Sequence, residues 1–173
     1  MKMKNSTKKL VFAAVFLALC LVLPFLTGNN RQLGTLLSLM HIPVLLCGFI
    51  CGWQYGLVVG LIAPILRSVL FGMPPMPVVA IPMAFELAAY GFLAGLLNKY
   101  LPKGNRFVFI SMVIAMIGGR LINLAASFLF GTPAILSSLH SLFIGTLPGI
   151  VIQMLLIPAV VGALNKARLM QDV

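Results

Sequence analysis

The sequence contains very few acidic residues. Of its 173 residues only Glu86 and Asp172 are acidic, and charged residues of both signs make up 8% of the chain. So few carboxylates exclude catalysis by a pair of acidic side chains. Hydrophobic residues make up 61%, and the mean hydropathy is +1.13. Because a chain of this length cannot bury so much apolar surface in a water-soluble core, we expect an integral membrane protein.

Several classes of functional motif are also missing. The sequence has no phosphate-binding G-x-x-x-x-G-K-[ST], no H-E-x-x-H and no G-x-S-x-G, so we do not expect an enzyme. Cys20, Cys47 and Cys51 lie in apolar segments at no zinc or redox spacing, which indicates buried free thiols. His41 and His140 have no Cys or carboxylate cluster beside them, so we expect neither a metal site nor another cofactor.

Long apolar segments dominate the rest of the chain. The stretch 33–72 is almost continuously apolar, but one helix of that length would reach about 60 Å, twice the thickness of the hydrocarbon layer. We predict a turn at "GWQYG", residues 52–56, where Trp53 and Tyr55 suit the membrane interface. The expected fold is all-α, with six transmembrane helices near residues 10–26, 33–52, 54–72, 79–97, 107–130 and 141–165.

The 12 basic residues indicate the orientation of the chain. They lie at the ends of the apolar segments and not in a patch with aromatic residues, so they indicate topology and not nucleic-acid binding. With both termini cytoplasmic, nine of them are inside and Arg31 alone is in an outer loop, as the positive-inside rule requires. The first apolar segment is too long for a typical signal peptide. We therefore expect residues 1–173 to form one multi-pass domain in lipid, with cytoplasmic termini.

Polar residues inside the predicted helices lie at similar depths. Counting about 1.5 Å per residue from the outer end of each helix places five of them about 8 to 15 Å below the outer surface: His41, Arg67, Glu86, Arg120 and Asn123. Gln153 is deeper, at about 18 Å. Arg120, Asn123 and Ser127 have the spacing of one helix face. The five residues of this layer and Ser127 form the predicted substrate-binding site.

Glu86 has two explanations. In the first, its carboxylate neutralises Arg67 across an antiparallel helix pair and has a structural role. In the second, Glu86 belongs to a polar pocket open to the outside, because two arginines facing one carboxylate leave a positive charge that requires an anion, water or a ligand. We favour the pocket. His41 is either a core residue or a ligand contact.

The loop "FGMPPMP", residues 71–77, follows the third predicted helix. Its three prolines fix the backbone, so we expect a stiff, extended segment. The segment is either a lid over the pocket or a simple connection. The candidate lid residues are Gly72, Met73, Pro74, Pro75 and Met76.

Small residues recur at every fourth position in two parts of the chain. Those of the second and third predicted helices are expected to let helix backbones pack closely within the protein: Gly48, Gly52, Gly56 and Gly60. Ala14 and Ala18 repeat this spacing on the first helix. There the strip is either internal packing or a contact for another protein.

The pattern "MHIPVLLCG…GMPP…MAFELAAYG" within residues 40–91 resembles the substrate-binding S components of energy-coupling factor (ECF) vitamin transporters. The basic N-terminus followed by "AAVFLA" is similar as well, and the resemblance covers nearly the whole chain. It implies a bacterial plasma-membrane protein that captures a water-soluble vitamin or precursor from outside. A separate transmembrane T component and two cytosolic ATPases would complete the transporter, with Ala14 and Ala18 as the implied contact with the T component.

The resemblance points to pantothenate, pyridoxine or hydroxymethylpyrimidine as the substrate. The carboxylate of pantothenate suits a surplus positive charge from Arg67 and Arg120, whereas a pyridine or pyrimidine alcohol suits hydrogen bonds to His41, Glu86 and Asn123. We favour pantothenate. Two other functions stay open: a facilitator or secondary carrier that works without ATPases, and a membrane scaffold that binds no small molecule.

Overall fold

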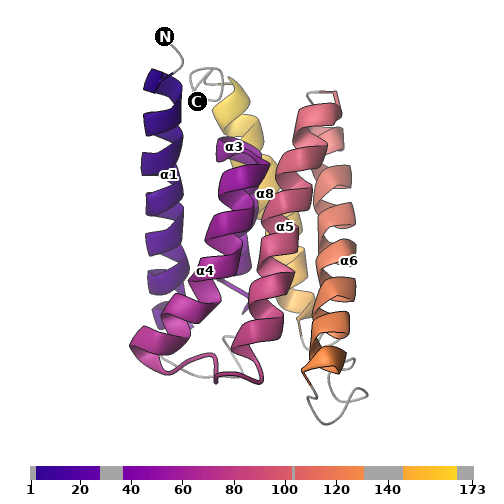
Figure 1. Cartoon of the computed structure of the whole chain (residues 1–173). Coiled ribbons are helices and arrows are strands. Elements are labelled where there is room, and N and C mark those ends of the chain that lie inside the picture. Colours follow the sequence, from indigo (N-terminus) through magenta and orange to yellow (C-terminus); the bar gives the residue numbers. More distant parts are fainter. Residues whose placement is uncertain (1–2, 28–36, 103, 131–145, 167–173) are drawn as a thin grey trace.

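The computed structural model describes residues 3–27, 37–102, 104–130 and 146–166, and within these ranges it has no strand. The helices form an up-and-down bundle in which α1 begins and α8 ends at the same end (Figure 1). That this end faces the cytoplasm stays a prediction. In chain order the helices are α1 (Met3–Val22), the 3-10 helix η1 (Leu23–Thr27), α3 (His41–Cys51), α4 (Trp53–Phe71), α5 (Ala80–Tyr100), α6 (Asn105–Leu129) and α8 (Leu147–Lys166).

Among the described residues, four helical segments are long and apolar enough to cross a membrane: Ser6–Leu26, Trp53–Phe71, Ala80–Tyr100 and Arg106–Leu129. They correspond to the predicted spans at 10–26, 54–72, 79–97 and 107–130. The apolar part of α8, Leu147–Ala163, is shorter, and residues 141–145 of the last predicted span lie outside the described residues. The fold is therefore all-helical with several apolar helices of membrane-spanning length, while the count of six spans stays a prediction.

The predicted span 33–52 is not one continuous helix. Residues 38–40 form a turn, Ser38 has a φ of 46°, and α3 has only 11 residues. Pro43 suits this start, because a proline in the first turn of a helix removes no helical hydrogen bond, although α4 also accommodates Pro64 in its interior. Pro43 is the third residue of α3. At about 1.5 Å per residue, α3 covers about 16 Å, half the thickness of the hydrocarbon layer.

A single residue, Gly52, connects α3 to α4. Its φ of 100° lies in a region that residues with a side chain rarely adopt. The N–H of Gly52 donates to the carbonyl of Gly48 at 3.1 Å, and the N–H of Gly56 donates to the carbonyl of Gly52 at 3.0 Å. The turn predicted at residues 52–56 is thus confirmed in position, but it is tighter than expected because Trp53 already begins α4.

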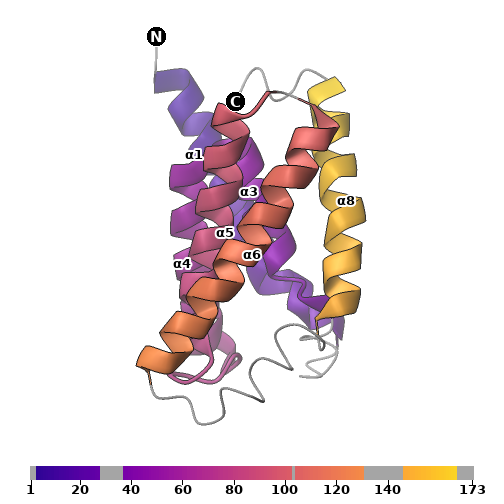
Figure 2. The ribbon, with the colours of Figure 1, turned by 90° about the vertical axis from the view of Figure 1, so that its right-hand side faces the viewer.

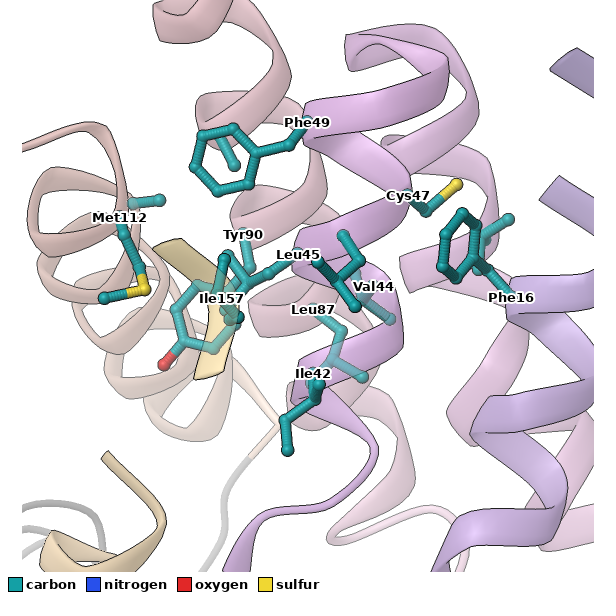
Figure 3. Packing of buried hydrophobic residues seen from close by; sticks show 14 of the residues in the cluster. Phe16, Ile42, Val44, Leu45, Cys47, Phe49, Leu87, Tyr90, Met112 and Ile157 are labelled. Carbon is teal, nitrogen blue, oxygen red and sulfur yellow. The ribbon is translucent and has the colours of Figure 1, made fainter. Parts of the chain in front are cut away.

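α3 occupies the centre of the bundle. Ten of its 11 residues are buried, as expected for a helix that is apolar on every side. Figure 3 shows Phe16 of α1, Leu87 of α5 and Ile157 of α8 beside the side chains of α3. α8 stands at the edge of the bundle, where it contacts α3 and α6 (Figure 2). The three cysteines are buried and free, as predicted: Cys20, Cys47 and Cys51.

α5 lies between α4 and α6 (Figure 1) and touches α4 backbone to backbone. A Cβ atom on Gly91 of α5 would collide with the carbonyl of Gly56 in α4, and one on Gly60 would collide with the carbonyl of Leu87. Such close approach of two helices requires glycine at the contact. Internal packing is thereby confirmed for three of the predicted glycines: Gly48, Gly56 and Gly60.

We predict that Gly91→Ala destabilises the protein by about 1–3 kcal/mol, the usual cost of overpacking, because its Cβ meets a backbone carbonyl that cannot move aside. Gly118→Ala on α6 is the matched control, since its Cβ meets only the end of the Leu93 side chain. Thermal unfolding of the detergent-purified variants measures both changes. Equal melting temperatures for the two variants would contradict the backbone contact.

Candidate functional site

Glu86, in the second turn of α5, is 2% exposed and is the only acidic side chain that the structure describes. The hydroxyl of Tyr90 donates to its Oε1 at 2.7 Å, and Nδ2 of Asn123 donates to its Oε2 at 2.7 Å. Nη1 of Arg120 lies 3.2 Å from Oε1, and Nε2 of His41 lies 3.8 Å from it. These groups offset the large cost of placing a carboxylate in an apolar interior.

α6 presents the polar face that its spacing predicted. Arg120 and Asn123 both reach Glu86, and Oγ of Ser127 donates to Oδ1 of Asn123 at 3.3 Å. Nη2 of Arg120 also donates to Oγ1 of Thr146 at 2.9 Å. Because Thr146 immediately precedes α8, the network links α5, α6 and the start of α8.

Two members of this network, Tyr90 and Thr146, were not predicted from the sequence. A signal for Tyr90 exists, because it follows Glu86 by four residues and so shares its helix face. Thr146 gives no comparable signal, since its contact with Arg120 depends on how α6 and α8 are placed in space.

His41 is the first residue of α3 and is 6% exposed. The break before Pro43 makes α3 begin beside Glu86, and the centroid of the His41 ring lies 5.3 Å from that of Tyr90. Neither nitrogen of the ring has a hydrogen-bond partner. The structure thus brings together five of the predicted site residues, whose part in binding stays a prediction: His41, Glu86, Arg120, Asn123 and Ser127.

Arg67 lies apart from this cluster. Its Nη1 donates to the carbonyl of Leu21 at 2.6 Å, and its guanidinium lies 5.1 Å from the ring centre of Phe25 and 5.7 Å from that of Phe71. Leu21 is at the end of α1, where carbonyls lose their helical partners, so Arg67 supplies a donor there. The predicted pair of Glu86 with Arg67 is therefore wrong, because Glu86 pairs with Arg120. The premise of the favoured pocket, that two arginines face one carboxylate, is wrong for the same reason.

The loop between α4 and α5 is tied to both helices. Oγ of Ser68 donates to the carbonyl of Pro74 at 2.5 Å, and the N–H of Ala80 donates to the carbonyl of Pro75 at 3.1 Å. Residues 76–79 form a turn, so the segment folds back instead of staying extended as predicted. It lies at the end of the bundle where α5 begins (Figure 1). Its role as a lid stays a prediction.

Ala14 and Ala18 both face outward from α1. Exposed apolar side chains lie around them on the same helix, including Val11, Val15 and Val22. The strip is therefore not used for packing among the described residues. Its contact with a partner stays a prediction.

A groove of about 390 Å³ lies near the turn between α3 and α4. Lys9, Trp53 and Lys99 help to line it, together with Asn98, whose Nδ2 donates to the carbonyl of Phe49 at 3.0 Å. The groove shares no lining residue with the Glu86 cluster. We place the candidate site at the cluster, because ionisable side chains buried inside a membrane protein commonly mark a functional site. Lysines at the end of a membrane helix are ordinary and carry no such indication.

Comparison with known proteins gives a family match. The model of the family described as "ECF transporter, substrate-specific component" matches residues 8–169, which is nearly the whole chain. No curated protein sequence and no solved structure matches the chain. The family match agrees with the resemblance carried by residues 40–91.

We predict that Glu86→Gln destabilises the protein by about 3–5 kcal/mol, because it leaves the buried guanidinium of Arg120 without its counter-charge. The double variant Glu86→Gln, Arg120→Gln should lose less than the sum of the single losses. Combining Glu86→Gln with Arg67→Gln is the control, and its losses should add, since these residues do not touch. Thermal unfolding in detergent measures both cycles. Additivity in the Arg120 cycle would contradict the pair.

Proposed function

Because the chain belongs to the family of ECF transporter substrate-specific components, we propose that it captures a small water-soluble vitamin or vitamin precursor at the outer face of a bacterial plasma membrane. Members of this family are substrate-binding subunits of transporters and not enzymes, and they work with a T component and ATPases. In our proposal this chain binds the substrate, and two cytosolic partner subunits hydrolyse ATP.

The cluster around Glu86 is the observation that carries this proposal. It unites polar side chains from α3, α5 and α6 in an otherwise apolar protein, and its members are almost fully buried. Ionisable side chains inside a membrane protein typically mark a substrate or ion site. We propose that five residues bind the substrate, beneath the loop that follows α4: His41, Glu86, Arg120, Asn123 and Ser127.

The position of Arg67 bears on the identity of the vitamin. The case for pantothenate rests on a surplus positive charge from Arg67 and Arg120 at one site. Arg67 contacts the end of α1 instead, and Arg120 is paired with Glu86. The argument from charge for pantothenate is thereby lost. The argument from hydrogen bonds for pyridoxine and hydroxymethylpyrimidine stays, since His41 and Asn123 lie beside Glu86.

The outward strip of α1 is the proposed contact with the T component. Two alanines one turn apart leave a shallow groove that a partner helix can approach closely. The strip is on the surface of α1, whereas the substrate cluster is buried among α3, α5 and α6. Binding of substrate and coupling to the partner are therefore assigned to separate parts of the chain.

We predict that the detergent-purified chain binds one vitamin molecule without nucleotide or partner, and that Asn123→Ala weakens this binding. Losing a hydrogen-bond partner at a buried charged group costs about 1.5–3 kcal/mol, which is roughly ten- to a hundredfold in affinity. Arg67→Ala is the control and should leave affinity within about threefold, because Arg67 lies outside the cluster. Calorimetric titration with a panel of water-soluble vitamins is the measurement. Failure of every vitamin to bind would overturn the proposed function.

We predict that Ala14→Trp combined with Ala18→Trp leaves vitamin affinity within about threefold but abolishes ATP-dependent uptake and co-purification with the T component. The two indole rings fill the groove on α1. Ala125→Trp, at an exposed alanine of α6, is the control and should leave uptake intact. Vesicle uptake and binding are measured side by side. If uptake by the double variant survives, the coupling surface lies elsewhere or the chain transports without ATPases.

A further inference from the structure

Among the described residues, four buried side-chain atoms have no hydrogen-bond partner: Oγ of Ser111 on α6, and three atoms at or near the start of α3, namely Nδ1 and Nε2 of His41 and Oε1 of Gln153. His41 is 6% exposed, and Gln153 is 1% exposed. Proteins pair nearly all of their buried polar atoms, because an unpaired one destabilises the fold. These three atoms are therefore suited to groups that the chain itself does not supply.

Gln153 and His41 meet at one backbone carbonyl. The carbonyl of Ser38 accepts Nε2 of Gln153 at 3.4 Å and the backbone N–H of His41 at 3.0 Å. Nε2 of His41 in turn lies 3.8 Å from Oε1 of Glu86. α8 thus brings Gln153 to the start of α3, next to His41 of the cluster. Counting residues along the predicted helix, by contrast, places Gln153 deeper than the other polar residues.

The charges of the cluster balance without a ligand. Arg120 lies 3.2 Å from Glu86, and Tyr90 and Asn123 each donate a hydrogen bond to the same carboxylate. The other intramembrane cation, Arg67, points to the end of α1. Glu86 is therefore the anion of this site. A second carboxylate would enter a buried environment in which the guanidinium is already paired, which disfavours an anionic substrate.

We infer that the site takes a substrate without net negative charge and that Gln153 of α8 is one of the residues that bind it. The inference rests on the proposed function and narrows its substrate class. A neutral imidazole offers one donor and one acceptor, and the amide oxygen of Gln153 accepts. A compound with hydroxyl or amino donors and a ring-nitrogen or carbonyl acceptor carries the groups that these three atoms lack.

Matched ligand pairs test the charge requirement on the unaltered chain in detergent. Pantothenate and pantothenyl alcohol differ in a carboxylate against a hydroxymethyl group, and 4-pyridoxate and pyridoxine differ in the same way. We expect the uncharged member of at least one pair to bind, and in every pair that binds it should bind at least tenfold more tightly. Tighter binding of the anionic member in either pair would overturn the inference. If no vitamin of the panel binds, the proposed function itself fails, which is a different outcome.

Gln153→Met tests the contact on α8, because it keeps the length of the side chain and removes the amide. It should weaken binding of the tightest uncharged ligand at least tenfold. Ser111→Ala is the control: Oγ of Ser111 is also buried without a partner, but it lies about 14 Å along α6 from Arg120, so affinity should stay within twofold. Unchanged affinity in Gln153→Met would overturn the assignment. If that variant does not fold, Gln153→Asn is tested instead. It should weaken binding by the same factor, because the shorter side chain moves the amide away from the ligand by one carbon.

Discussion

A carboxylate in the apolar interior of a membrane protein needs donors on several sides, and Glu86 obtains them from its own helix and from α6, with His41 of α3 close by. Tyr90 donates from α5, and Arg120 and Asn123 donate from α6, while Nε2 of His41 lies 3.8 Å away at the start of α3. The rotation of α6 relative to α5 is therefore constrained, because turning either helix would leave a buried charge unpaired. The same requirement concentrates the polar chemistry of the protein at one place.

The short helix α3 places a polar residue of the cluster, His41, in the middle of the bundle. The helix begins late, with Pro43 in its first turn, and Gly52 ends it after 11 residues. Its first residue, His41, thus lies deep among the other helices and beside Glu86. A full-length helix here would present only side chains of its flank, whereas the broken chain also exposes the carbonyl of Ser38 to Gln153.

Much of this arrangement is visible in the sequence. The lengths of the apolar segments predict α4, α5 and α6 closely, because the thickness of the membrane limits each span. The spacing of Arg120, Asn123 and Ser127 predicts a shared face, and the small residues predict close backbone contact. Pro43 also indicates that α3 begins late, but hydropathy alone hides that signal within a long apolar stretch.

The partner of Glu86 is not visible in the same way. Depth along a helix places Arg67 and Arg120 in one layer, but it does not say toward which neighbour each side chain points. That direction depends on the rotation of each helix, which is set by the whole bundle. Gln153 shows the same limit, since its contact with Ser38 depends on where α8 packs against α3.

The glycine contact between α4 and α5 has a mechanical consequence. Backbone meets backbone from Gly95 and Trp53 at one end to Gly60 and Leu87 further along, so over this length the two helices have no side chains that could rearrange between them. Beyond Gly60 neither helix has a glycine, and the two helices are joined by the loop at residues 72–79. The contact is thus a pivot. Any movement that parts α4 from α5 has to splay them at the loop end, which is the end where α5 carries Glu86.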